Sequence, residues 1–203
     1  MNYFVTGIDT DSGKTFVSAI LCEALKADYW KPVQAGIPAD SEIITGLVSN
    51  PTLVIHPETF FLKTPASPHA AAKLDGVEIR LADFKLPETT NNLIIEGAGG
   101  CLVPLDEQNF VIELARQFSA EVVLTADLYL GSINHTLLTI NELKRRTLNV
   151  KGIIFNGEPN SESERIILQH AQLPCLLRIV REKALTKEIT KKYAAQLLSN
   201  WYE

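Results

Sequence analysis

Cysteine is scarce in this chain of 203 residues, which contains three. The odd count and the wide spacing of Cys22, Cys101 and Cys175 argue against a disulfide framework and against a zinc site built from cysteine pairs. The four histidines have no metal-ligand spacing either. Because hydrophobic residues make up 46% of the chain, we expect a core that needs neither a disulfide nor a structural metal.

Basic runs and long apolar runs are missing as well. The formal net charge is −5, and no stretch of lysine or arginine could follow a nucleic-acid backbone. No apolar run approaches the roughly 20 residues that span a membrane. The first expected strand begins at residue 2 or 3, so we expect no signal peptide. These features predict a cytoplasmic protein that has neither a nucleic-acid partner nor a membrane partner.

Short apolar runs alternate with helical spacing along the chain. The runs predict buried strands over residues 3–6, 28–33, 92–96, 121–126, 150–155 and 175–180. The helical spacing predicts helices over residues 15–26, 41–48, 70–74, 81–84, 109–118, 132–146, 161–170 and 186–199, and the remaining long segments, 34–41 and 50–68, are predicted loops. This alternation is typical of an α/β fold whose parallel, doubly wound sheet has helices on both faces. The length fits a single domain over residues 1–203.

The stretch YFVTGIDTDSGKT, from Tyr3 to Thr15, has the layout of a P-loop. A short strand leads into a loop between Gly7 and Gly13, and a helix follows. Backbone N–H groups and the helix dipole would bind phosphate there, Lys14 would reach the β/γ-phosphates, and the Thr15 hydroxyl would bind Mg2+. The usual pattern has four residues between its glycines and this loop has five, so a chance Gly-Lys-Thr tripeptide is the alternative.

Charged side chains also follow two predicted strands. Glu96 ends one strand before a run of glycines, where a carboxylate could bind Mg2+. Lys31 ends another, where its charge suits a transferring phosphoryl group, although a lysine reaching into solvent is the alternative. Asp40 is a second candidate magnesium ligand, or simply a helix cap. Because the carboxyl ends of parallel strands share one edge of a sheet, we expect these side chains to lie close together.

Three further positions could contact ligands. The Thr10 hydroxyl lies in the loop and could hydrogen-bond a substrate anion. The helix that begins near Ser132 could bind a carboxylate through its free N–H groups, unless Ser132 or Asn134 merely caps it. Asn156 ends a strand, and its carboxamide could bind a purine edge or belong to a turn. The residues alone leave these alternatives open.

Five segments together resemble the dethiobiotin synthetase family. They are TGIDTDSGKT (6–15), YWKPVQAG (29–36), SPH (67–69), EGAGG with the following Pro104 (96–104) and LGSINH (130–135). The resemblance implies a homodimeric ligase of biotin synthesis that uses ATP and Mg2+. It implies that 7,8-diaminononanoate reacts with CO2 to a carbamate, that ATP phosphorylates the carbamate, and that the second amine closes the cyclic urea.

The resemblance also implies roles for individual residues. Lys31, Lys14 and Thr10 would be catalytic. The magnesium ligands would be Thr15, Asp40 and Glu96. The nucleotide would be bound by Asp11, Ser12, Gly13, Lys14, Thr15, Phe16, Asp40, Glu96, Gly97, Ala98, Gly99 and Asn156. The substrate would be bound by Thr10, Ala35, Ser132, Ile133 and Asn134, although family members often have a hydroxyl residue where this chain has Ala35. Residues 180–185 match the family weakly, which leaves the nucleotide base open.

Two other classes of protein share parts of this pattern. A partition or assembly ATPase of the same P-loop clan is the first alternative, but such proteins have an extra lysine early in the loop, and residues 7–12 contain none. A small-molecule kinase is the second, and its arginine-rich lid would have to come from Arg178 and Arg181. We therefore predict the ligase.

Overall fold

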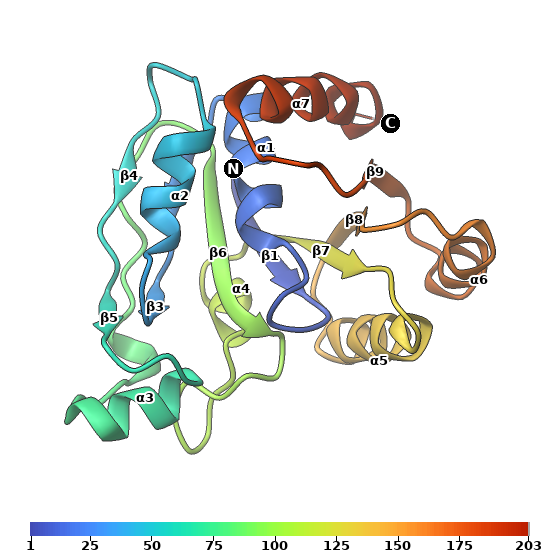
Figure 1. The fold of residues 1–203 in the computed structure, drawn as a ribbon. Coiled ribbons are helices and arrows are strands. Elements are labelled where there is room, and N and C mark those ends of the chain that lie inside the picture. The colour runs from blue at the N-terminus through green and yellow to red at the C-terminus, as the bar shows by residue number, and fades with distance from the viewer. Residues whose placement is uncertain (203) are drawn as a thin grey trace.

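The computed structural model describes residues 1–202, and its centre is a parallel sheet of seven strands (Figure 1). The strands lie in the order β4-β2-β6-β1-β7-β8-β9, and every neighbouring pair is parallel. Their bounds are β1 Asn2–Gly7, β2 Asp28–Trp30, β4 Ile55–His56, β6 Leu93–Gly100, β7 Glu121–Asp127, β8 Val150–Asn156 and β9 Cys175–Ile179. The doubly wound parallel sheet predicted from the sequence is confirmed.

Helices cover both faces of this sheet (Figure 1). One face is covered by α1 Lys14–Leu25, α2 Asp40–Leu47 and α7 Lys187–Trp201. The other is covered by α3 Pro68–Asp75, α4 Glu113–Gln117, α5 Ser132–Arg145 and α6 Ser161–Ala171. A short 3-10 helix, Leu81–Asp83, precedes β6. Within residues 1–202, no helix combines the length and the apolar character that crossing a membrane requires.

Neighbouring side chains of each strand pack on opposite faces of the sheet. Val5 of β1 lies in the apolar cluster beneath α1 and α7, whereas Phe4 lies in the cluster beneath α3 and α4. In β6, Ile94 lies in the cluster beneath α1 and α7, and Ile95 lies in the cluster beneath α3 and α4. Because both faces are covered, every position of these strands favours an apolar side chain, which explains the continuous apolar runs in the sequence.

The sheet edge formed by β2 and β4 differs from the prediction. The strand expected over residues 28–33 ends at Trp30, because Pro32 has no N–H to donate to a ladder. The chain resumes as β3 (Val33–Ala35), which pairs with β5 (Phe60–Leu62) in a separate two-stranded sheet. The predicted loops 34–41 and 50–68 were therefore wrong in part, since β3 extends into the first and β4 and β5 lie within the second.

The helix predicted over residues 109–118 is also shorter than expected. The Asp106 carboxylate accepts backbone hydrogen bonds from Gln108 and Asn109, at 2.8 and 2.7 Å. Phe110 then forms a β-bridge with Pro104. These contacts hold the chain in a turn, so the α-helix begins only at Glu113.

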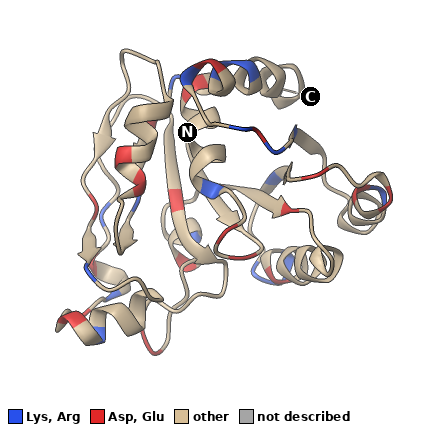
Figure 2. Cartoon of the chain, viewed as in Figure 1, with Lys and Arg blue, Asp and Glu red and all other residues tan. Residues whose placement is uncertain are grey.

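Acidic and basic residues occur together on several of the helices (Figure 2). Both signs are present along α7 and on α3, α5 and α6. This mixture agrees with a composition of 24 acidic and 19 basic residues.

Candidate functional site

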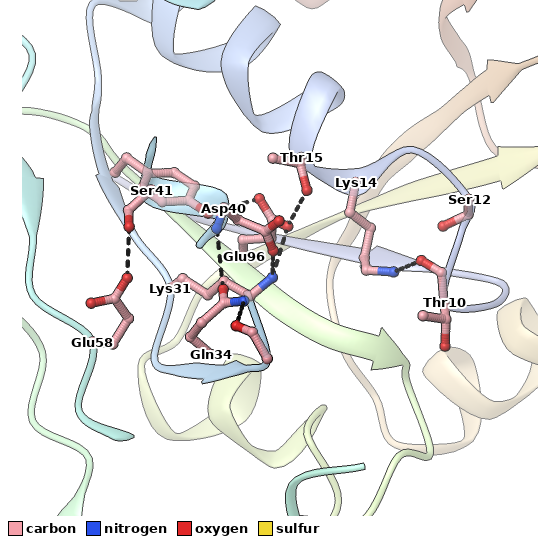
Figure 3. A network of polar contacts seen from close by, with 12 residues as sticks. Thr10, Ser12, Lys14, Thr15, Lys31, Gln34, Asp40, Ser41, Glu58 and Glu96 are labelled. Carbon is pink, nitrogen blue, oxygen red and sulfur yellow. Dashed lines mark hydrogen bonds and ion pairs between the residues drawn. The ribbon is translucent and has the colours of Figure 1, made fainter. Parts of the chain in front are cut away.

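The loop between β1 and α1 folds over the side chain of Lys14 (Figure 3). The Lys14 ammonium donates to the backbone carbonyls of Asp9 and Thr10, at 3.0 and 2.7 Å. The Ser12 hydroxyl donates to the same Asp9 carbonyl at 3.0 Å. A Cβ added to Gly7 would lie 2.0 Å from the Ser12 hydroxyl oxygen, so the turn requires glycine at that position. The strand, loop and helix that the sequence predicts for a phosphate cradle are present, and the loop closes around the Lys14 ammonium.

The electrostatic environment of Lys14 is unusual for a lysine. Burial is the main cause that lowers the pKa of Lys14 from 10.5 to about 8. The nearby Lys31 charge lowers this pKa too, whereas the Glu96 carboxylate raises it. An anion placed beside the ammonium would therefore compensate a charge that the free protein stabilises poorly.

Four polar side chains meet beside the start of α1 (Figure 3). Lys31 forms ion pairs with Asp40 and Glu96, and its Nζ lies 3.1 Å from the Glu96 Oε1. The Thr15 hydroxyl donates to the same Glu96 oxygen at 2.9 Å. The sequence-based expectation that these residues lie together at one edge of the sheet is confirmed. Asp40 does not cap α2, because the N-cap residue is Ala39.

Glu96 carries its charge in the interior, where only 1% of the residue is exposed. Burial alone would raise the pKa of Glu96, but the Lys31 charge and several hydrogen bonds, including that from Thr15, lower it below the usual value. The Tyr29 hydroxyl donates to the second carboxylate oxygen, Oε2, at 3.0 Å. Burial and then the Glu96 charge raise the pKa of Tyr29 well above its usual value, so this hydroxyl stays protonated.

The oxygen atoms of Thr15, Asp40 and Glu96 suit a magnesium ion. Mg2+ prefers hard oxygen ligands and usually keeps water and phosphate oxygens besides one or two carboxylates. The Lys31 ammonium, which is paired with both carboxylates, indicates that the space between them favours positive charge. In residues 1–202, no group of three or more His, Cys, Asp or Glu side chains could hold a metal. A magnesium ion here would therefore need further oxygen ligands from phosphate or water.

The cradle and the ion-paired group line one cavity of about 450 Å³. Eleven of the predicted site residues contribute to its wall, namely Thr10, Asp11, Gly13, Lys14, Thr15, Lys31, Ala35, Asp40, Glu96, Ala98 and Gly99. Gly36 and Pro65 form part of the wall next to Ala35. Gly36 has a φ of +82°, and a Cβ there would lie 2.8 Å from the Cβ of Pro65. The wall near Ala35 thus requires a residue without a side chain.

Four predicted nucleotide-binding residues, Ser12, Phe16, Gly97 and Asn156, lie outside the wall of this cavity. Ser12 is buried within the loop. The Phe16 side chain belongs to the core, where its ring packs edge-on against Tyr193 at a centroid distance of 6.0 Å. Gly97 lies in β6 against Phe4, since a Cβ added to it would be 3.1 Å from the Phe4 ring. The glycine run is part of the strand rather than a loop, because β6 continues to Gly100.

Asn156 lies against the cradle at the end of β8. Its side-chain Nδ2 donates to the backbone carbonyl of Ser12 at 3.0 Å. A Cβ added to Gly13, whose φ is +92°, would lie 2.5 Å from this nitrogen. The contact joins two parts of the chain that lie 144 positions apart.

The predicted substrate-binding residues at the start of α5 are not part of the first cavity. Ser132, Ile133 and Asn134 line a second cavity of about 570 Å³. α5 begins after Gly131, which has a φ of +106° and no side chain to cap the helix. The Ser132 N–H already donates to the Tyr129 carbonyl at 3.0 Å. Within one chain, the predicted substrate contacts therefore fall into two separate cavities.

Known proteins resemble the chain over nearly its whole length. A family model described as an AAA domain matches residues 1–189. A relative from Cytophaga hutchinsonii, named ATP-dependent dethiobiotin synthetase BioD, is 59% identical over 203 residues, which cover 99% of this chain and 98% of the relative. This chain belongs to the dethiobiotin synthetase family. A second relative with that name, from Christiangramia forsetii, is 45% identical over 195 residues, or 95% of this chain and 94% of the relative.

Two solved structures share the fold of this dethiobiotin synthetase family member. A putative plasmid partition protein from Borrelia burgdorferi, solved bound to AMPPNP, aligns with a TM-score of 0.59 at 12% identity, covering 99% of this chain and 97% of that one. A ParA family ATPase from Chlorobium tepidum aligns with a TM-score of 0.56 at 12% identity, covering 96% of this chain and 97% of that one. At this identity the likeness shows the fold alone, whereas the sequence relatives favour the dethiobiotin synthetases over the partition ATPases.

Two polar residues of the dethiobiotin synthetase site were missed by the sequence analysis. Tyr29 contacts Glu96, as described above. Gln34 is 5% exposed, and its Nε2 donates to the Gly36 carbonyl at 3.0 Å while its Oε1 accepts from the Asp40 N–H at 3.2 Å. Both lie within three positions of Lys31 in the segment YWKPVQ. For Tyr29 the available signal was a polar atom in a predicted buried strand, whereas Gln34 lies in a predicted loop and gave no such signal.

Proposed function

We propose that this chain forms dethiobiotin from 7,8-diaminononanoate, CO2 and ATP, releasing ADP and phosphate. CO2 adds to one amine and gives a carbamate. The terminal phosphoryl group of ATP transfers to a carbamate oxygen, and the second amine attacks the carbonyl carbon, expels phosphate and closes the ring. The juxtaposition of the Lys14 cradle with the Lys31, Asp40 and Glu96 group in one cavity carries this proposal, together with the names of the sequence relatives.

The cradle residues bind the triphosphate in this proposal. The N–H groups at the start of α1 and the Lys14 ammonium contact the β- and γ-phosphates. Lys31 exchanges its carboxylate partners for the transferring phosphoryl group and stabilises the charge that develops there. Thr10 contacts the carbamate, because its hydroxyl lies at the cavity wall beside Gly99. These roles make Lys14, Lys31 and Thr10 the catalytic residues.

Magnesium completes the proposed ATP site. Thr15, Asp40 and Glu96 would hold the ion, which neutralises phosphate charge when it is bound. Asp40 and Glu96 would then have a cationic partner both with and without the metal. In the free protein that partner is Lys31, and in the nucleotide complex it would be Mg2+.

We assign the substrate carboxylate to the start of α5 and the active form to a homodimer. The exposed side chains of Tyr129 and Leu130, which precede Ser132, are apolar surface that a second copy could cover. A dimer would bring a second chain's residues within reach of a substrate whose amines lie in the first cavity. We expect sedimentation analysis to give twice the mass of the chain, and a monomer would contradict the homodimer.

Cytoplasmic localisation is part of the same proposal. Cys22, Cys101 and Cys175 are free thiols, as is usual in a reducing compartment. Burial raises the pKa of Cys101 to about 11, so its thiol is held in the unreactive form. All proposed substrates are small molecules, and the reaction involves neither a nucleic acid nor a membrane.

The coupling of ATP cleavage to both other substrates tests this function. We expect phosphate release only when 7,8-diaminononanoate and bicarbonate are both present, with one phosphate for each dethiobiotin. Lys14→Ala is the control that should lack this activity. Equal phosphate release without the diamine would contradict the ligase and favour an assembly ATPase.

Asn156 is the proposed contact to the adenine base. We expect Asn156→Ala to lower the preference for ATP over GTP about tenfold, because the carboxamide supplies paired hydrogen bonds to one purine edge. The ratio of kcat/KM for the two nucleotides measures this effect. If Asn156→Ala acted only by loosening the cradle through the lost Ser12 contact, kcat/KM would fall equally for ATP and GTP. An unchanged ratio would therefore contradict a contact between Asn156 and the base.

Protonation of Lys14 should accompany nucleotide binding. With a pKa of about 8 in the free protein, about half of the molecules lack this proton at pH 8. The phosphates stabilise the ammonium and raise its pKa, so binding takes up about half a proton at pH 8, and affinity falls as the pH rises above this value. Calorimetry in two buffers of different ionisation enthalpy measures the uptake. Lys14→Met should remove it, and the same uptake in this variant would contradict the assignment.

A further inference from the structure

Tyr29 reaches Glu96 across two neighbouring strands. In the parallel register of β2 and β6, Tyr29 lies opposite Ile94. Glu96 is two positions further along β6, so its side chain leaves the sheet on the same face as that of Ile94. Both Tyr29 and Ile94 belong to the cluster beneath α1. The tyrosine ring spans the remaining distance, and its hydroxyl donates to the Glu96 Oε2 at 3.0 Å.

The two oxygens of Glu96 have different partners. Oε1 accepts from the Thr15 hydroxyl and the Lys31 ammonium, at 2.9 and 3.1 Å. Oε2 accepts from Tyr29, which is fully buried. A buried hydroxyl is costly to leave without a partner, and a tightly packed ring has little freedom to move. Tyr29 therefore fixes the orientation of the carboxylate and directs Oε1 toward Thr15 and Lys31.

We propose that Tyr29 is a positioning residue that orients the Glu96 carboxylate for the magnesium-bound nucleotide. This inference rests on the proposed magnesium role of Glu96. Tyr29 does not line the cavity, so it acts through Glu96 and not by touching the substrates. Without the hydroxyl, the carboxylate can rotate, and the oxygen that the metal needs is correctly placed for only part of the time.

Nucleotide affinity with and without metal tests this role. ADP binding to Tyr29→Phe is measured by calorimetry in Mg2+ and in EDTA. We expect the gain in ADP affinity from Mg2+ to fall about tenfold, as befits the loss of a hydrogen bond to a charged group, and the affinity in EDTA to stay within about twofold. Tyr3→Phe is the matched control, because Tyr3 is a buried tyrosine of β1, the other neighbour of β6, and its hydroxyl contacts the Met1 sulfur at 3.6 Å. It should leave both affinities unchanged.

Each other outcome overturns the inference in an identifiable way. An unchanged magnesium effect in Tyr29→Phe, or an equal loss with and without Mg2+, would leave Tyr29 with a structural role only. Absence of a magnesium effect in the unaltered protein would overturn the magnesium site itself, and with it the role of Tyr29. If Tyr29→Phe does not fold, fluorotyrosine at position 29 keeps the ring and the hydroxyl. Its fluorine resonance should shift with magnesium-ADP but not with ADP alone, and an equal shift in both would contradict the proposal.

Discussion

Lys31→Ala is expected to form dethiobiotin about a thousandfold more slowly than the unaltered protein. Lys31 carries the positive charge that we assign to the transferring phosphoryl group, and it lies in the cavity between Asp40 and Glu96. Nucleotide affinity should change much less, because Lys14 and the cradle amides remain. Steady-state kinetics and ADP calorimetry measure the two effects. Near-normal turnover in Lys31→Ala would remove Lys31 from the catalytic residues.

The same substitution should also destabilise the free protein. Removing Lys31 leaves the buried Glu96 without its main charge partner, which typically costs about 3–5 kcal/mol when a buried ion pair is broken. Lys31 holds the pKa of Glu96 low, so this carboxylate should take up a proton at higher pH in the variant. Denaturant unfolding at several pH values measures the loss, which should shrink as the pH falls and Glu96 is neutralised. Lys31→Arg is the control that keeps the charge, and an equal loss of stability in both variants would contradict the ion-pair explanation.

Glu96→Gln is expected to lower activity at least a hundredfold at millimolar Mg2+ and to raise the Mg2+ concentration that gives half-maximal rate more than tenfold. The amide keeps the size of the side chain and can still accept from Thr15, but it removes the charge that favours a cation. Titration of the initial rate with Mg2+ measures both changes.

Glu58→Gln is the matched control for this experiment. Glu58 is a nearby carboxylate whose Oε1 accepts from the Ser41 hydroxyl at 2.8 Å, outside the Lys31 group (Figure 3). Its substitution should leave the Mg2+ dependence unchanged. Equal Mg2+ dependence in Glu96→Gln and the unaltered protein would contradict the assignment of Glu96 to the metal.

The parts of the site that the sequence predicted depend on local patterns and on one topological rule. The cradle is a single contiguous stretch, so its strand, loop and helix could be recognised without any long-range contact. Lys31 and Glu96 are 65 positions apart, yet each ends an apolar run in the sequence, and parallel strands bring the ends of such runs to one edge. The sheet order places β2 directly beside β6, which makes their ion pair possible.

The missed features depend on packing that no local pattern records. β3 and β5 have three residues each, too few to show a periodicity. The contact of Tyr29 with Glu96 follows from the register of two strands, and Gln34 binds Asp40 only because the intervening loop folds back. The helix start at Ser132 was predicted correctly, but its separation from the first cavity depends on where α5 lies relative to the cradle. Such distances between elements are set by the tertiary structure.

A crystal structure with Mg2+, a non-hydrolysable ATP analogue and 7,8-diaminononanoate tests the central claim most directly. We predict that the terminal phosphates lie against the backbone amides that precede Lys14 and that the metal contacts oxygens of Thr15, Asp40 and Glu96. The Lys31 ammonium should then lie within hydrogen-bond distance of a γ-phosphate oxygen. Phosphates bound elsewhere, or Lys31 and Glu96 side chains directed away from them, would contradict the proposed mechanism.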